Sequence, residues 1–132
     1  MILLDTHVLI WGVNGDRHLL SAPAAAAIEA EAQRGEIALS SITAWEIAML
    51  VARGRLALSM EATQWLAAIE DADVAKFVPV DRDIAVIAAE LPGEFHKDPV
   101  DRIIVATARK LGVAIVTADE KIRRYPHVRT IW

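Results

Sequence analysis

Four acidic residues are the strongest candidates for chemistry in this sequence: Asp5, Glu46, Asp101 and Asp119. Three of them come after expected β-strands, and Asp101 lies near the start of an expected helix. Carboxylates gathered in one cleft repel one another, and they cannot all ionise without a compensating cation. The chain has no cysteine and no suitably spaced histidines, so oxygen ligands favour a hard cation such as Mg²⁺ or Mn²⁺. Such a site suits phosphoryl transfer, because the cation neutralises a phosphodiester and lowers the pKa of an attacking water.

Each of these acids also has a purely structural interpretation. Asp5 and Asp119 could each cap the helical segment that follows it, which is a common use of aspartate. Glu46 fits a capping box with Thr43, flanked by a hydrophobic staple. Asp101 could be a first-turn acid that the helix dipole favours. The functional interpretation therefore depends on whether the fold brings the four acids together.

The helix that carries Asp101 is the best-defined element of the sequence. Asp98 fits the N-cap, Pro99 fits the first helical position, and Gly112 fits the residue that ends the helix. Asp101 is expected on the inward face, which apolar residues continue at helical spacing: Ile104, Val105, Ala108 and Leu111. A capping side chain turns back onto the amides of its own helix. We therefore expect Asp98 to cap the helix and Asp101 to face the site.

The elements that must position these acids alternate along the chain. Short apolar runs predict five strands, at residues 2–4, 36–40, 77–80, 113–116 and 128–131. Helices are expected at residues 8–11, 22–34, 43–53, 59–71, 81–91 and 99–111. Pro79 suggests that its strand lies at an edge. Strands that alternate with helices imply right-handed crossovers, and so an α/β fold with a parallel sheet flanked by helices.

A parallel sheet would bring three of the acids to one place. The carboxyl ends of all its strands lie at one edge, where open α/β sheets bind their ligands. Asp5, Glu46 and Asp119 then converge, provided that their strands are neighbours. Thr6 and Thr117 stand beside two of these acids, where they could orient the carboxylates or contact phosphate as supporting residues.

The composition is that of one folded domain. The chain has 132 residues, of which 55% are hydrophobic, and a net charge of −4. Residues 1–96 carry a net charge of −8, whereas residues 97–132 carry +4. This asymmetry could mark the approach of an anionic partner or only a solvated surface. We find neither a signal peptide nor an apolar run of membrane-spanning length, so a cytoplasmic protein without a membrane partner is expected.

Four stretches of the chain, taken in order, resemble one family. They are LLDTHVLIW at 3–11, SSITAWEIAML at 40–50, HKDPVDRIIVATARKLG at 96–112 and VTADEKI at 116–122. Together they look like a PIN-domain ribonuclease, and in particular like the VapC toxin of a type II toxin–antitoxin pair. The resemblance spans nearly the whole chain, and it implies a single PIN domain over residues 1–132.

The resemblance also implies a mechanism and partners. Asp5 and Asp101 would be the principal Mg²⁺ ligands, with Mn²⁺ as a possible substitute. Glu46 would complete the ligand set or position the water, and Asp119 would have the least fixed role. The family implies a sheet ordered 3-2-1-4-5, an RNA substrate, homodimers, and a small VapB-like antitoxin that occludes the active site.

The remaining polar and aromatic residues are expected to have structural roles. The histidines form no ligand spacing and are expected to be structural or surface residues: His7, His18, His96 and His127. Arg102 could simply pair on the helix with Asp98, four residues before it. Trp11, Trp45 and Trp65 lie in apolar segments, which favours the core or an interface over base stacking. Trp132 has no assignment.

Four other functions share some of these sequence features with the ribonuclease. A phosphoacceptor signalling domain would use an aspartate after the third strand, for which Asp81 is available, but Asp5 lacks a paired acid. A haloacid-dehalogenase-type phosphatase needs an aspartate at position 7, which is histidine. A binding module that kept only the fold would not need the full acidic set. A structure-selective DNA nuclease of the same superfamily is the nearest enzymatic alternative, although the chain is short for DNA-gripping elements.

Overall fold

A computed structural model describes all residues, 1–132, and its centre is a five-stranded parallel sheet. The strands run in the order β3-β2-β1-β4-β5, as the family resemblance implies. Their bounds are β1 Ile2–Leu4, β2 Ile37–Ser40, β3 Ala75–Val78, β4 Ala114–Val116 and β5 Thr130–Ile131. β1 lies in the middle, paired with β2 on one side and β4 on the other. The strands that precede Asp5 and Asp119 are therefore direct neighbours.

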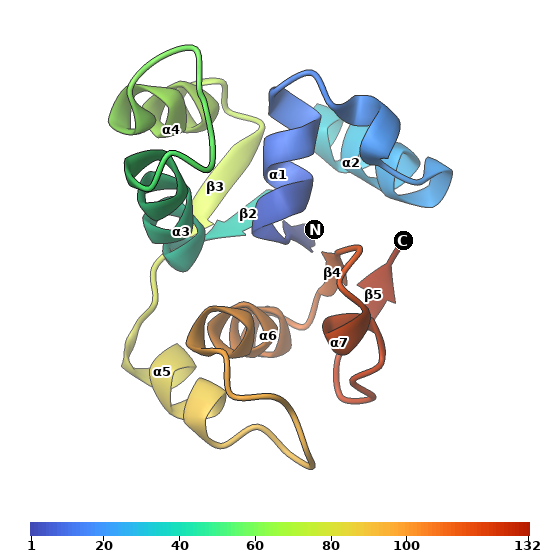
Figure 1. Ribbon diagram of the computed structural model, residues 1–132. Helices are drawn as coiled ribbons and strands as arrows, with labels where there is room; N and C mark the ends of the chain where they lie inside the picture. Colours follow the sequence, from blue (N-terminus) through green and yellow to red (C-terminus); the bar gives the residue numbers. More distant parts are fainter.

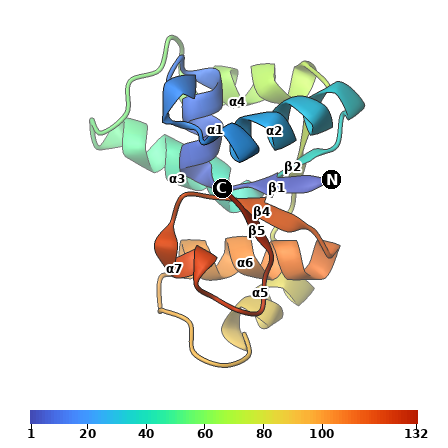
Figure 2. The same ribbon diagram turned by 90° about the vertical axis from the view of Figure 1, so that its right-hand side faces the viewer.

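Helices cover both faces of the sheet, which gives three layers (Figures 1 and 2). One layer contains α1 (Thr6–Val13), α2 (Ala22–Arg34) and α4 (Ala62–Asp71), and the other contains α5 (Arg82–Ala89), α6 (Pro99–Leu111) and α7 (Glu120–Arg123). Helix α3 (Ser41–Ala52) follows β2 directly and contacts both α4 and α6. A short 3₁₀ turn, Arg17–Leu19, joins α1 to α2. No helix is both long enough and apolar enough to cross a membrane.

Two apolar cores lie on opposite faces of the sheet, because successive strand residues point to opposite sides. Leu4 packs into the larger core, with α1, α2 and α4. Leu3 and Ile115 pack into the second core, with Ile104 of α6. Every residue of β1, β2 and β4 is buried. Each covered strand contributes to both cores, and this fixes the register that brings the carboxyl ends level.

The helix-end signals in the sequence match the structure at α2 and α6. Ser21 caps α2, and Gly35 ends it in the left-handed conformation at φ +66°. Asp98 caps α6 by accepting a hydrogen bond from the Val100 amide at 2.9 Å. Gly112 ends α6 with φ +69°, a conformation that costs glycine little because it has no Cβ. The helix that carries Asp101 thus begins and ends where the sequence predicts.

The predicted starts of two helices, α3 and α4, are wrong. Helix α3 begins at Ser41, and its cap is the Ser40 hydroxyl, which accepts a hydrogen bond from the Ile42 amide at 3.2 Å. Thr43 is therefore inside the helix and fully buried, so it forms no capping box with Glu46. Helix α4 begins at Ala62 rather than at Ser59.

The strands at the two edges also differ from the prediction. β3 covers residues 75–78 rather than 77–80, so Pro79 follows the strand instead of lying in it. β3 is nevertheless an edge strand, as Pro79 suggested. β5 is reduced to residues 130–131. Both edges are short and add little to the core, which is why their apolar patterns define them poorly.

Candidate active site

Asp5 lies at the carboxyl end of the central strand and is held from two directions. Its Oδ1 accepts a hydrogen bond from the Thr6 amide at 2.8 Å, at the start of α1. Its Oδ2 accepts a hydrogen bond from the Thr117 hydroxyl at 2.7 Å, just past β4. Only 8% of Asp5 is exposed. Burial raises the pKa of Asp5, although these two hydrogen bonds act against the rise.

Thr117 and Asp119 continue this arrangement at the next strand. The Thr117 hydroxyl donates to Asp5 and also accepts a hydrogen bond from the Asp119 amide at 3.0 Å. The Asp119 carboxylate accepts from the Lys121 amide at 2.8 Å and so caps α7. Asp119 therefore fills the capping role that its position allows. Its charge also reaches Asp5, whose pKa it helps to raise.

Asp101 is the most strongly perturbed acid in the molecule. Burial contributes most to raising the pKa of Asp101 to about 7, and neighbouring carboxylates add to the effect: Asp98, Asp5, Asp119 and Glu46. The fold therefore brings the other predicted acids within range of the charge of Asp101. Asp101 faces the strand ends, as its place on the inward face of α6 predicts, whereas Asp98 is exposed and caps the helix.

Glu46 reaches the site from α3. It is six residues past the end of β2, in the second turn of the helix, rather than directly at the strand end. Its side chain forms no hydrogen bond in the structure, so no capping role accounts for it. Thr43, one turn earlier on the same helix, shares a buried hydrogen bond of 3.1 Å with the Thr6 hydroxyl. This bond joins the starts of α1 and α3, and so fixes Glu46 relative to Asp5.

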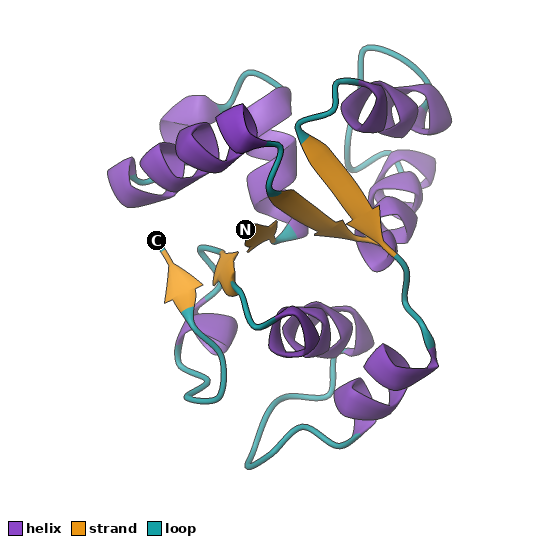
Figure 3. Ribbon diagram, turned by 180° about the vertical axis from the view of Figure 1, so that it is seen from behind, coloured by secondary structure: helices purple, strands orange, loops and turns teal.

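His96 also belongs to the site, although its spacing in the sequence gave no sign of this. Its Nε2 lies 3.0 Å from Oδ2 of Asp101, an ion-pair distance, in a direction that does not form a regular hydrogen bond. His96 comes from the loop of residues 90–98 that joins α5 to α6 (Figure 3). The prediction that this histidine is only structural or a surface residue is incomplete, because its ring is partly buried against Asp101.

Arg102 holds that loop in place, and it does not pair with Asp98. Its guanidinium donates to the carbonyl oxygens of Ala88 at 2.8 Å, Phe95 at 3.1 Å, His96 at 3.2 Å and Ala89 at 3.3 Å. The planar fork of arginine suits several acceptors at once, which lysine cannot match. Asp101 and Arg102 are adjacent on α6, yet one faces the site and the other organises the loop that carries His96.

A divalent cation fits this donor set. No three acidic or histidine side chains are close enough together to hold a metal ion as they stand. The acids nevertheless offer only oxygen ligands, and burial with nearby carboxylates raises the pKa of Asp5 and Asp101, so their ionised forms would gain from an added positive charge. A bound hard cation would supply that charge. Small side-chain movements would have to accompany binding.

Two other features of the molecule carry no comparable chemistry. Asp81 caps α5 and pairs with Lys110 at 2.6 Å, and this contact lowers the pKa of Asp81. It is half exposed and follows the edge strand, so it makes a poor phosphoacceptor.

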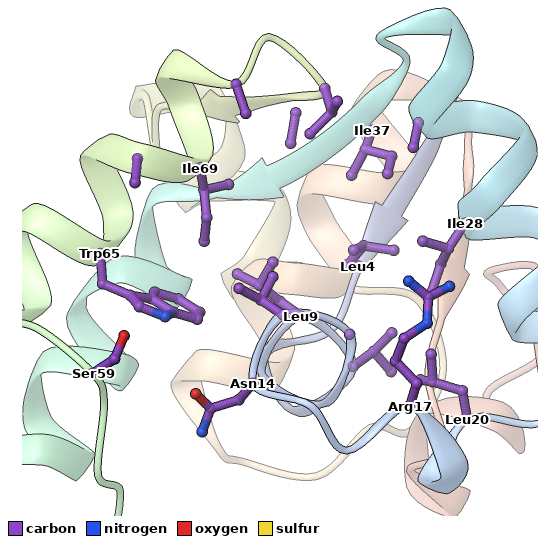
Figure 4. Close-up of a pocket in the computed structure, with 18 of the residues that line it drawn as sticks. Leu4, Leu9, Asn14, Arg17, Leu20, Ile28, Ile37, Ser59, Trp65 and Ile69 are labelled. Atoms are coloured by element: carbon purple, nitrogen blue, oxygen red, sulfur yellow. The ribbon is translucent and has the colours of Figure 1, made fainter.

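The largest cavity, about 410 Å³, lies between α1, α2 and α4 and has apolar walls that include Leu9, Trp65 and Ile69 (Figure 4). No acidic side chain lines it.

Comparison with known proteins gives both a family and structural relatives. The sequence profile of the PIN domain matches residues 2–128. The chain is 35% identical over 133 residues to ribonuclease VapC22 of Mycobacterium tuberculosis, covering 99% of this chain and 98% of that protein.

Solved structures of low sequence identity share the fold. The VapBC2 complex of Rickettsia felis bound to a DNA fragment from its promoter matches with a TM-score of 0.69 and 18% identity, over 98% of this chain and 97% of the other. The DNA-bound VapBC complex of Salmonella typhimurium matches with a TM-score of 0.69 and 19% identity, over 98% and 95%. At this identity the likeness supports the fold alone.

Proposed function

This chain belongs to the PIN-domain family, and we propose that it hydrolyses RNA phosphodiester bonds with a bound divalent cation, Mg²⁺ or in its place Mn²⁺. It is a VapC-type ribonuclease and acts as the toxin of a toxin–antitoxin pair. The observation that carries the proposal is the convergence on Asp101, where burial and neighbouring carboxylates together raise the pKa to about 7. Because ionising these clustered carboxylates costs free energy, a bound cation would stabilise their charged forms.

Each of the four acids has a different role in this proposed site. Asp5 and Asp101 are the principal ligands, because both are partly desolvated and face the same strand ends. Glu46 completes the ligand set or positions the attacking water. Asp119 already caps α7 with one oxygen, so it acts mainly through its charge. The cation supplies a Lewis acid that neutralises the phosphodiester and lowers the pKa of the attacking water.

The threonines support the proposed ligands. Thr117 fixes one oxygen of Asp5 by donating its hydroxyl hydrogen, which leaves the Asp5 carboxylate in a single orientation. Thr6 holds the other oxygen through its backbone amide, and its hydroxyl ties α1 to α3. Supporting contacts of this kind orient metal ligands and set their affinity. Asp98 supports the site by capping the helix that presents Asp101.

The partners in this proposal are RNA, a small VapB-like antitoxin and a second copy of the chain. The relatives whose structures are solved are toxin–antitoxin complexes, which supports an antitoxin that occludes the acids. The homodimer and the cytoplasmic location stay predictions. Light scattering on the purified protein tests the dimer.

The deciding experiment compares Asp101→Asn with Asp98→Asn. The native protein is expected to cleave single-stranded RNA with Mg²⁺ or Mn²⁺ and to stop when EDTA is added. Asp101→Asn keeps the side-chain shape but removes a ligand charge, so cleavage should fall by roughly 10²- to 10³-fold. Asp98→Asn is the matched control, since asparagine caps a helix about as well as aspartate, and it should keep most of the activity.

Three results would contradict the proposal. Full activity in EDTA, with cyclic-phosphate products, would exclude a required cation. An inactive Asp98→Asn protein beside an active Asp101→Asn protein would reverse the two assignments. Cleavage of branched or flapped DNA in preference to RNA would favour the structure-selective DNA nuclease instead. Circular dichroism of each variant shows whether a loss of activity is a loss of fold.

A further inference from the structure

A second cavity adjoins the candidate active site and shares two of its acids. Its volume is about 260 Å³, and it lies between the start of α1 and the segment that follows β4. Asp5 and Asp119 form one part of its wall, and His7 and Trp11 form another. Two of the proposed metal-site acids and two aromatic rings therefore share one small cavity.

The rings belong to a row that leads away from the acids. His7 and Trp11 are one turn apart on α1, with ring centroids 6.0 Å apart. Trp132, which follows β5, lies next along the row, with its ring centroid 6.1 Å from that of Trp11. They meet because β5 runs parallel to β4 and β4 to β1, so the chain ends at the edge of the sheet where α1 begins. This row of His7, Trp11 and Trp132 is here called the aromatic row.

Core packing accounts for only part of the aromatic row. Trp11 and Trp132 are partly buried and pack against the larger core, so each has a structural role. His7 is exposed and takes no part in either core. The fold gains little from an aromatic ring at His7, yet that ring lines the cavity beside Asp5. The side chain is therefore better explained by a ligand than by stability.

The chemistry of the cavity wall favours a neutral, flat ligand. Without a bound cation, a phosphate group placed against Asp5 and Asp119 would be repelled by two carboxylates. A nucleobase is uncharged and stacks on aromatic rings, so it suits the part of the wall that the rings form. Bases of single-stranded RNA are free to stack in this way, whereas bases of duplex RNA are not. With the proposed cation bound, the phosphate attached to such a base would lie toward the acids.

We propose that this cavity binds one base of single-stranded RNA beside the bond to be cut, stacked on the His7 ring and in contact with Trp11, whose ring is tilted by 53° to that of His7, and that the next base along the strand lies over Trp132. The inference rests on the proposed ribonuclease function and adds the part of the substrate that is recognised. It makes His7 a substrate-positioning residue. It also makes a single-stranded segment, rather than a duplex, the form of RNA that the protein cleaves.

The first test is RNA binding in EDTA, where the proposed cleavage cannot occur. The probes are fluorescein-labelled single-stranded decamers of uridylate and of adenylate, titrated and followed by anisotropy. His7→Ala should weaken binding roughly tenfold, the scale of one base stacked on one aromatic side chain. His7→Phe keeps a ring and should restore most of the affinity. His18→Ala is the matched control, because His18 is also exposed but lies outside the cavity, and its affinity should be unchanged.

A second variant pair extends the test along the aromatic row. Trp132→Ala should weaken binding severalfold, and Trp132→Phe should not. RNA should quench the tryptophan fluorescence of the native protein, and Trp132→Phe should show less of this quenching. Trp45→Ala tests a rival surface, since Trp45 is 55% exposed on α3 beside Glu46 and outside the aromatic row. Affinity lost in Trp45→Ala but not in His7→Ala would overturn the inference.

Cleavage assays separate this inference from the proposed function. In Mg²⁺, His7→Ala should raise KM about tenfold and leave kcat within a few-fold of the native value. If the native protein cleaves RNA and His7→Ala has the native KM, the base site is wrong and the ribonuclease stands. If the native protein binds the decamers with the expected variant pattern but cleaves none, the ribonuclease is wrong and the base site stands. Failure to bind single-stranded RNA, or a preference for duplex RNA, would overturn the base site.

Discussion

The two pairs of acids in the candidate site are held in different ways. Asp5 and Asp119 follow parallel strands, and hydrogen bonds from neighbouring residues fix both carboxylates. Asp101 and Glu46 project from α6 and α3, and neither carboxylate accepts a regular hydrogen bond; Asp101 has only its contact with His96. We call the first the strand pair and the second the helix pair.

The two pairs therefore differ in whether their carboxylates are fixed in orientation as well as in position. The strand pair is already oriented by the chain that carries it, so it provides a fixed half of the site. The helix pair is positioned by packing between layers, and no hydrogen bond of the regular kind fixes the orientation of its carboxylates. No three ligands are yet gathered around one point. A cation held by Asp5 and Asp101, as proposed, would therefore have one ligand from the strand pair, which is already oriented, and one from the helix pair.

The largest expected effect comes from the support of the helix pair. Arg102→Ala removes hydrogen bonds to the carbonyls of four residues and frees the loop that holds His96 at Asp101. We expect a loss of about 2–3 kcal/mol in the free energy of unfolding, because partly buried carbonyls lose a charged donor. Urea titration measures it. Arg102→Lys should recover only part of the loss, since it lacks the planar fork.

This result also tests whether the loop matters for function. If Arg102→Ala is as stable as the native protein, the loop does not depend on its guanidinium. If the variant is destabilised but has native Mn²⁺ affinity at a temperature where it stays folded, the contact between His96 and Asp101 does not support the helix pair. Either outcome would weaken the distinction between the two pairs.

The next effect comes from the support of the strand pair. Thr117→Val keeps the shape of the side chain but removes the hydroxyl that donates to Asp5. We expect Mn²⁺ affinity, followed by calorimetry, to fall about 10- to 100-fold, the usual scale for a residue that orients a metal ligand. Thr117→Ser keeps the hydroxyl and should restore the affinity. Equal affinity in the valine and serine variants would mean that Asp5 needs no such orientation.

The smallest effect is a pH-dependent stability difference in the metal-free protein. Burial and neighbouring charge raise the pKa of Asp101 from 3.8 to about 7, so the unfolded chain ionises first as pH rises. The native protein therefore loses stability between about pH 4 and pH 7. The full difference would correspond to about 4 kcal/mol, and partial solvent exposure reduces it to about 1–2 kcal/mol.

Asp101→Asn should accordingly melt several degrees above the native protein at pH 8 in EDTA and at the same temperature at pH 4. Asp5→Asn should gain less, because the ionised Asp5 accepts two hydrogen bonds that partly offset its burial. Thermal melts of both variants across this pH range make the measurement. A larger gain for Asp5→Asn would reverse the comparison of the two pairs.

The sequence by itself determined the features that depend on neighbouring residues. Asp98 and Pro99 define the start of α6 because capping and a fixed φ act within one turn. Gly112 defines its end for a similarly local reason. The strand order came from the family resemblance, because apolar runs predict strands without saying which of them pair.

Tertiary structure decided the features that join distant segments. Thr43 has a good local signal for a cap, but α3 begins directly after β2, so Thr43 lies inside the helix. The Thr43 hydroxyl instead shares a hydrogen bond with the Thr6 hydroxyl. His96 reaches Asp101 only because Arg102 folds the loop back onto α6. The row from His7 to Trp132 spans almost the whole chain, and only the pairing of β5 beside β4 brings its ends together. No local pattern encodes such contacts, because their energy comes from packing that exists only once the sheet has formed.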